Sequence, residues 1–286
     1  MEFSIGVLAD SFRLGVEEDI RKAREVGATG IQLYATSGPL APESLTPARR
    51  GELRDIIASN GLTVSALCGD LGGGFADPAQ NKWRVEKSKR IMDLAKELGT
   101  HVITTHIGVV PASPDHPRWK ILQEACEALG EYGDSVGAYF AVETGPEPAA
   151  VLRRFLDSLH SRSVRVNLDP ANLAMVTGDD PVRAVGILGE YIVHTHAKDG
   201  VLLRAGNPEI TYRMIPPDAD VGPEFKEVPL GEGSVDFPRY LQALDAVGYH
   251  GFLTIEREVG EQPERDIRTA VTFLGRTVAE LGGKIK

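Results

Sequence analysis

The sequence predicts an α/β protein that folds as a single (β/α)8 TIM barrel. Eight short apolar runs recur along its 286 residues, and a segment with helical periodicity follows each of them. Alternating strands and helices imply a parallel sheet with right-handed crossovers, and eight such units in this length fit a closed barrel. The alternative is an open doubly wound sheet, which often has a glycine-rich phosphate loop after its first strand. No GxGxxG pattern follows the first run here, so the barrel is favoured.

The eight predicted strands are rich in Val, Ile, Thr and aromatic residues, and Gly or polar clusters flank most of them. They are FSIGVLA (3–9), GIQLYA (30–35), LTVSALC (62–68), HVITTHI (101–107), AYFAVE (138–143), VRVNLD (164–169), YIVHTHA (191–197) and GFLTIE (251–256). The helices expected after them are amphipathic, and the first two end in Gly, which is common just beyond a helix. They cover residues 16–27, 47–61, 81–99, 119–137, 147–160, 180–190, 237–248 and 263–283.

The stretch from Gly200 to Asp236 follows the seventh strand and has no sustained periodicity. A connection this long inside a compact domain is usually functional or disordered. Because it follows a barrel strand, it would lie over the face that carries the chemistry. We therefore expect one domain over residues 1–286 with a long insertion at about 200–236. This insertion is interpreted as a lid or substrate loop, and a merely variable insertion is the alternative.

Composition and charge exclude several classes of protein. The net charge is −10, whereas a protein that binds a nucleic-acid backbone usually carries a basic stripe. No apolar run approaches the roughly 20 residues that a membrane span needs, and the first residues lack a signal-peptide pattern. Two distant cysteines, Cys68 and Cys126, suggest a reducing compartment. We expect a cytoplasmic protein with neither nucleic-acid nor membrane partners.

Polar residues close four of the later strands, where the active site of a barrel lies. These residues are Glu143, Asp169, His196 and Glu256. Three carboxylates meeting at one mouth would repel one another without a cation. Carboxylate oxygens with a single imidazole suit Mn²⁺, Mg²⁺ or Co²⁺ better than Zn²⁺. The predicted cofactor is thus one divalent ion, Mn²⁺ ahead of the others. The alternative is a set of ion pairs with Lys198, Arg257 and Arg153.

Other residues near the strand ends are candidates for substrate contacts. They are His106, Lys198, Cys68 and Tyr34. Lys198 shares a face with His196 because side chains alternate along a strand, and a salt bridge to Asp199 is the alternative for it. Gln32 could line the same pocket as Tyr34. His194 lies one pleat deeper than His196 and is expected to be structural.

The run GDLGGG at residues 69–74 is rich in glycine. Its backbone N–H groups could face an anion, which would suit a phosphorylated sugar. It lacks the lysine of a P-loop, so a flexible turn is the favoured interpretation.

Five motifs in this order carry a family resemblance. They are AVETG, NLDPANL, VHTHAKD, PLGEGSVDF and FLTIERE. The whole chain resembles the sugar isomerase/epimerase family with the xylose-isomerase-like barrel. That family includes the ketose 3-epimerases and inosose dehydratase and is distantly related to endonuclease IV.

The resemblance implies both a metal site and a reaction. Its metal ligands correspond to Glu143, Asp169, His196 and Glu256, and Glu143 and Glu256 would also be the catalytic acid/base pair. The ion would polarise a sugar carbonyl and stabilise an enediolate, while one carboxylate removes the α proton and the other returns it. A small sugar or keto-sugar substrate is implied, and so is a homo-oligomer, dimer or tetramer.

Two departures from the ketose epimerases leave the reaction open. Asn172 stands where the ketose epimerases have a His. They also have an Arg shortly after the metal-binding His, and that position is Leu here, with Lys198–Asp199 after His196 instead. Asn172 and Lys198 are therefore expected to contact a different substrate. The alternative reaction is a metal-dependent β-elimination by a lyase or dehydratase on a 3-keto sugar, keto-glycoside or inosose. A non-catalytic sugar-binding barrel is a further hypothesis, and a DNA repair endonuclease is disfavoured by the acidic charge.

Overall fold

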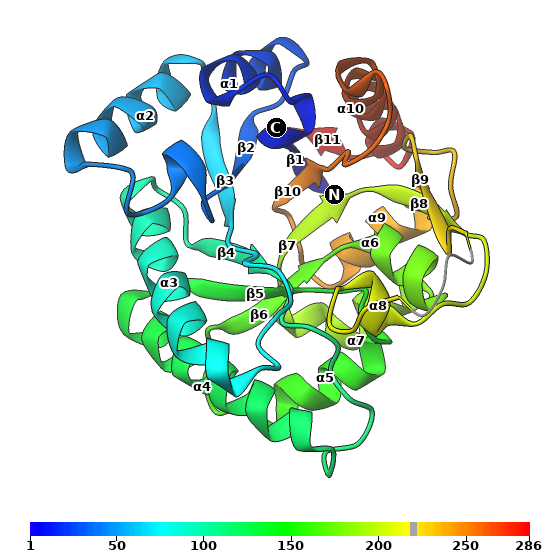
Figure 1. Ribbon diagram of the computed structural model, residues 1–286. Helices are drawn as coiled ribbons and strands as arrows, with labels where there is room; N and C mark the ends of the chain where they lie inside the picture. The colour runs from blue at the N-terminus through cyan, green and yellow to red at the C-terminus, as the bar shows by residue number, and fades with distance from the viewer. Residues whose placement is uncertain (218–221) are drawn as a thin grey trace.

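Eight parallel strands close into a barrel in the computed structural model, which describes residues 1–217 and 222–286 (Figure 1). In chain order they are β1 (Glu2–Leu8), β2 (Gly30–Tyr34), β3 (Thr63–Cys68), β4 (Val102–Thr105), β5 (Tyr139–Glu143), β6 (Val164–Leu168), β7 (Ile192–Ala197) and β10 (Phe252–Ile255). Each strand pairs with the next along the chain, and β10 pairs back to β1 with Ser4 opposite Phe252. The predicted single (β/α)8 TIM barrel is confirmed.

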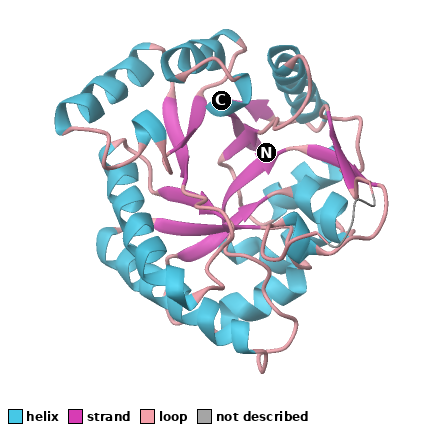
Figure 2. Cartoon of the chain, viewed as in Figure 1, coloured by secondary structure: helices cyan, strands magenta, loops and turns pink. Residues whose placement is uncertain are grey.

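Helices surround the strands, as Figure 2 shows. Eight of those in the described residues follow the barrel strands. They are α1 (Val16–Glu25), α2 (Pro47–Ser59), α3 (Pro78–Glu97), α4 (Pro117–Val136), α5 (Ala149–Asp157), α7 (Pro181–Leu188), α9 (Phe237–Ala246) and α10 (Pro263–Glu280). Asp77, Asp180 and Asp236 each cap a helix whose first turn contains proline, because a carboxylate there accepts otherwise unpaired backbone N–H groups. None of the helices in the described residues is long and apolar enough to span a membrane.

Several short elements were not predicted. The last strand, β11 (Lys284–Ile285), pairs with the start of β1. The 3-10 turns are η1 (Ala9–Phe12), η2 (Gly38–Leu40) and η4 (Gly189–Tyr191). After β6 the chain forms α6 (Pro170–Asn172) and then a π-helical turn, η3 (Leu173–Thr177). Turns of the π type are often found at functional sites, and this one lies at the mouth of the barrel.

The insertion after β7 is partly regular. It contains β8 (Asp199–Leu202), α8 (Pro208–Thr211) and β9 (Phe225–Val228), and β8 and β9 form an antiparallel pair. The Asp199 carboxylate accepts backbone N–H groups from residues 200, 231, 233 and 235, which fixes the base of this segment. An ion pair of 2.7 Å between Glu209 and Arg118 ties α8 to the start of α4. The part of the predicted insertion at 218–221 lies outside the described residues.

Gly74 lies where the loop after β3 meets the loop after β4. Its φ is 62°, and a Cβ at this position would lie 2.3 Å from backbone atoms of Ile107 and Gly108. We expect Gly74→Ala to lower the free energy of unfolding by more than the about 1–3 kcal/mol that a left-handed backbone costs a non-glycine residue. Urea denaturation measures the loss.

Gly72→Ala is the matched control for this prediction. Gly72 has a similar φ of 74°, but a Cβ there would meet nothing within 4 Å. Gly72→Ala should therefore lose only the free energy that a left-handed backbone costs alanine, without the added cost of a steric clash. Equal losses in the two variants would contradict the close approach of the two loops.

Candidate active site

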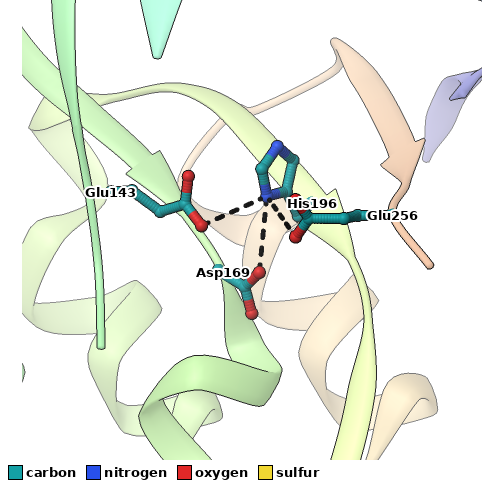
Figure 3. Close-up of side chains that lie close together, drawn as sticks. All are labelled: Glu143, Asp169, His196 and Glu256. Atoms are coloured by element: carbon teal, nitrogen blue, oxygen red, sulfur yellow. Dashed lines mark hydrogen bonds and ion pairs between the residues drawn. The ribbon is translucent and has the colours of Figure 1, made fainter. Parts of the chain in front are cut away.

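Four ionisable side chains from separate strands meet at the mouth of the barrel (Figure 3). Glu143 ends β5, Asp169 follows β6, His196 lies on β7 and Glu256 follows β10. One nitrogen or oxygen atom from each lies within 4.8 Å of the others. His196 Nδ1 lies 3.5 Å from Glu143 Oε1 and 3.3 Å from both Asp169 Oδ2 and Glu256 Oε2. We call these four residues the carboxylate cluster.

All four residues of the carboxylate cluster are buried. Burial raises the pKa of Asp169, because the charged form loses its hydration. Burial would also raise the pKa of Glu256, but Lys198 and His196 hold it well below its usual range. Burial likewise opposes the charged form of His196, yet Glu256 and Glu143 hold its pKa well above the ordinary value.

The alternative to a metal was a set of ion pairs between the cluster and Lys198, Arg257 and Arg153. Only Lys198 forms such a pair in the described residues. Lys198 Nζ lies 3.0 Å from Glu256 Oε2. The two arginines pair elsewhere, with Arg257 bound to Glu227 and Asp266 and Arg153 bound to Asp157 and Glu190. Within residues 1–217 and 222–286, no Lys or Arg forms an ion pair with Glu143 or Asp169. Histidines are their charged partners in the described residues, His196 for both and His106 for Glu143. Three buried carboxylates around one imidazole form a donor set that fits a divalent ion.

The far side of the His196 ring is held by an amide. His196 Nε2 lies 3.1 Å from Gln32 Oε1, and Gln32 Nε2 donates to Thr104 Oγ1 at 2.8 Å. The Asn167 amide nitrogen is 3.3 Å from the same Nε2, but it also donates to Glu143 Oε2 at 3.1 Å. In the neutral ring, an Nε2–H that donates to Gln32 leaves the Nδ1 lone pair pointing at the three carboxylates. This is the tautomer that a metal-binding histidine requires.

Replacing Gln32 with leucine should weaken divalent-metal binding by about 10–100-fold, the usual cost of losing the partner that orients a histidine ligand. A competition titration of Mn²⁺ against a chromophoric chelator measures the dissociation constant. Gln123→Leu is the matched control, since the Gln123 side chain on α4 bonds to Ser158, away from the cluster. Unchanged affinity in a folded Gln32→Leu variant would show that the amide does not orient the ring.

The loop after β6 places two further groups against the cluster. Asp169 caps α6 by accepting the backbone N–H of Asn172 at 2.8 Å, so the sequence DPAN fixes the carboxylate locally. The side chain of Asn172 donates to Glu143 Oε1 at 3.0 Å. With the Asn167 bond to Oε2, both oxygens of Glu143 accept an amide donor, and this orients its carboxylate.

A cavity of about 280 Å³ opens above the carboxylate cluster. Three cluster residues, Glu143, His196 and Glu256, line it, while Asp169 is fully buried and does not. The five residues predicted to contact substrate all line this cavity: Tyr34, Cys68, His106, Asn172 and Lys198. Gln32 does not line it, because that side chain binds His196 instead. Cys126 is buried in α4.

His106 is held by a carboxylate on one side. Its Nδ1 lies 3.0 Å from Asp70 Oδ2, and its ring packs against Tyr212 at 4.8 Å between centroids. Its Nε2 is buried without a hydrogen-bond partner in the described chain and lies 3.6 Å from Glu143 Oε1. Burial would lower the pKa of His106, but Glu143 and Asp70 raise it to about 9. His106 therefore presents an N–H donor to the cavity side at neutral pH.

Lys198 is fully enclosed by acidic side chains. Its Nζ contacts Glu256, Glu258 and Glu227, the last at 3.6 Å. Asp199 does not pair with it, so the salt bridge weighed for these two neighbours is wrong. The carboxylate of Asp199 is occupied by backbone N–H groups instead. His194, as expected, is structural: its Nδ1 lies 2.8 Å from Asn167 Oδ1 and its Nε2 lies 3.0 Å from Thr254 Oγ1.

Sequence reasoning missed several residues that line the cavity. They are Thr211, Tyr212, Arg213 and Phe225 from the insertion, Met175 and Val176 from η3, and Glu258. Glu258 could have been found, because it lies in the motif FLTIERE two residues after Glu256. The insertion residues gave no such signal, since that segment has no periodicity.

Comparison with known proteins places the chain in a family. The family model described as "Xylose isomerase-like TIM barrel" matches residues 20–277. The uncharacterized protein YfiH of Bacillus subtilis is 24% identical over 81% of this chain and 83% of its own length. Inosose dehydratase of Geobacillus thermodenitrificans is 27% identical over 49% of this chain and 47% of its own.

Solved structures agree with this placement. A xylose isomerase domain protein from Planctomyces limnophilus has a TM-score of 0.80 and 26% identity, covering 98% of both chains. L-ribulose 3-epimerase has a TM-score of 0.72 and covers 97% of this chain and 95% of its own, and at 18% identity it shares the fold alone. With a family model that matches nearly its whole length and a structural neighbour across all of the barrel, this chain belongs to the xylose isomerase-like TIM barrel family.

Proposed function

We propose that this chain is a divalent-metal-dependent sugar isomerase or epimerase that removes a proton alpha to a carbonyl and passes through an enediolate. The observation that carries this proposal is the buried carboxylate cluster, three carboxylates and one imidazole within 4.8 Å, at the base of a cavity. Glu143, Asp169, His196 and Glu256 would hold the ion. When bound, a divalent ion, Mn²⁺ by preference, supplies the positive charge that polarises a substrate carbonyl.

Glu143 and Glu256 are the proposed acid and base. In the ring of strands, β6 and β7 lie between β5 and β10, so the two carboxylates approach the cavity from different sides. One could remove the proton from one face of the substrate and the other return it on the opposite face. Asn167 and Asn172 orient the first carboxylate, and Lys198 orients the second.

The size of the cavity limits the substrate. At about 280 Å³ it lies just below the usual range for small-molecule pockets, roughly 300–1,000 Å³. A monosaccharide or keto-inositol fits this description better than an oligosaccharide. Tyr34, Cys68, His106, Asn172 and Lys198 are the proposed substrate contacts. A cytoplasmic location and a homo-oligomeric state stay predictions.

β-Elimination by a lyase or dehydratase is the second candidate, and His106 favours it. A leaving hydroxyl must take up a proton, and His106 Nε2, which has no hydrogen-bond partner in the described residues, is a suitable donor on the cavity wall. The partial similarity to an inosose dehydratase points the same way.

Product mass separates the two reactions. The Mn²⁺-loaded chain is incubated with free ketoses, ketose phosphates, 3-keto sugars and inososes, and the products are analysed by mass spectrometry. Epimerisation or isomerisation conserves mass, and this is the expected result. Loss of water or of an aglycone would establish the elimination instead. No turnover across the panel would favour a sugar-binding barrel without catalysis.

A further inference from the structure

Two arginines, one lining the cavity and one packed against its glycine loop, lack partners within the described residues. Arg213 lines the cavity from the insertion, and Arg84 on α3 lies directly behind Gly73, another cavity residue. Neither guanidinium forms a hydrogen bond or an ion pair within the described residues. The other charged groups around the cavity are paired: Lys198 with three carboxylates and His106 with Asp70.

Arg84 is the more unusual of the two. Its Nε and Nη1 atoms are buried without a partner, and its Nη2 lies 3.3 Å from where a Cβ on Gly73 would be. Leaving the N–H groups of a charged side chain unsatisfied is costly, so such groups usually meet a ligand or water. Burial would raise the pKa of Asp70, but His106, the N–H of Gly72 and the charge of Arg84 lower it.

The glycine loop beside Arg84, which lines the same cavity as Arg213, adds further donors. Gly72, Gly73 and Gly74 all have left-handed φ angles, between 62° and 74°. The N–H of Gly72 is bonded to Asp70 at 2.8 Å, whereas those of Gly73 and Gly74 have no partner in the described chain. Successive backbone N–H groups in a turn can form a concave site that favours anions.

Arg213 is held in an unfavourable backbone conformation. Its φ is 57°, and only one other non-glycine residue in the described chain, Arg13, has a positive φ. The surrounding turn enforces it, because Met214 N donates to Glu209 O at 2.7 Å and Glu209 is anchored to Arg118. A strained residue at the edge of a ligand cavity indicates a position kept for function.

We propose that Arg84, Arg213 and the loop 72–74 form a subsite for an anionic group of the substrate, either a carboxylate or a phosphoryl group. The subsite lies on the rim of the cavity whose base is the carboxylate cluster. The substrate would thus be an acidic or phosphorylated keto sugar, with its carbonyl toward the cluster and its anion toward the arginines. This inference rests on the proposed function, because it assumes that the cavity binds the substrate.

The test measures anion affinity directly. Inorganic phosphate and acetate are each titrated calorimetrically into the full chain loaded with Mn²⁺. Arg84→Gln and Arg213→Gln are each expected to weaken binding by about tenfold or more, since each removes a charge-assisted hydrogen bond. Arg54→Gln on the outer helix α2 removes the same charge far from the cavity and should leave the affinity unchanged.

The two probes distinguish the two ligand groups. A preference for phosphate that depends on both arginines assigns a phosphoryl subsite, and a preference for acetate assigns a carboxylate subsite. Any direct binding of the anion to Mn²⁺ is common to all the variants, so it cancels in the comparison. The proposal would be overturned if the wild-type chain bound neither anion, or if Arg84→Gln and Arg213→Gln both bound the anions as tightly as wild type.

Failure of the subsite and failure of the proposed function give different results. A chain that binds the anion through both arginines but turns over no keto sugar keeps the subsite and loses the proposed reaction. If the chain epimerises neutral sugars and neither arginine substitution changes its anion affinity, the proposed reaction stands and the subsite is refuted.

Discussion

Glu143→Gln and Glu256→Gln are each expected to slow proton transfer by about 10²–10⁴-fold at saturating Mn²⁺, the usual contribution of a positioned acid or base. Glutamine keeps the size of the side chain and an oxygen toward the cluster, but it cannot accept the substrate proton at neutral pH. The measurement is the rate of product formation from a confirmed substrate, with the metal content of each variant determined alongside.

Glu147→Gln is the matched control for these two variants. Glu147 lies in the loop that follows β5, is buried, and accepts the backbone N–H of Val110 at 2.9 Å. Burial raises the pKa of Glu147 to about 8, so its carboxyl is protonated at neutral pH and glutamine resembles it closely. Its rate should stay within a few-fold of wild type. Wild-type rates in metal-loaded Glu143→Gln and Glu256→Gln would contradict their assignment as acid and base.

Asp169→Asn is expected to leave the free energy of unfolding unchanged or higher without metal, and to lower it relative to wild type when metal is present. Without metal, the substitution removes one of three buried negative charges, and burial disfavours the charged Asp169 by raising its pKa. The variant should therefore be at least as stable as wild type in chelator. With metal at 100 times its dissociation constant, wild type should gain about 2.7 kcal/mol that the variant largely lacks.

Urea denaturation with Mn²⁺ and with chelator measures all four values. An asparagine oxygen can still accept the N–H of Asn172, so the cap of α6 is retained and does not confuse the comparison. A substitution that merely damages the fold would lower stability under both conditions. Equal stabilisation of the variant and wild type by Mn²⁺ would show that Asp169 does not bind the ion.

The barrel itself could be predicted because its signal is local and repeated. Each strand is a short apolar run bounded by Gly or polar residues, and each helix carries an amphipathic period. The same regularity placed Glu143, Asp169 and Glu256 at strand ends, where a closed parallel barrel must bring them together. For such residues, position along a strand is enough to predict position in space.

Contacts between distant segments could not be predicted in this way. Gln32 and His196 are 164 residues apart, and nothing local to either indicates that they meet. The partners of Lys198 were misjudged for the same reason, since Glu227 comes from a strand inside the aperiodic insertion. Arg213 lines the cavity only because anchors elsewhere hold its turn in place. These features depend on tertiary structure that no local pattern encodes.

Solvent deuterium exchange is the most direct test of the central claim, that the carboxylate cluster holds a metal and moves a proton alpha to a carbonyl. The Mn²⁺-loaded chain is incubated in D₂O with keto sugars that carry an anionic group and with neutral ones, and deuterium at the α carbon is followed by NMR. The account predicts incorporation that stops when the metal is chelated and falls sharply in Glu143→Gln and Glu256→Gln. Turnover without any solvent deuterium in the product, or exchange that continues fully in chelator, would contradict it.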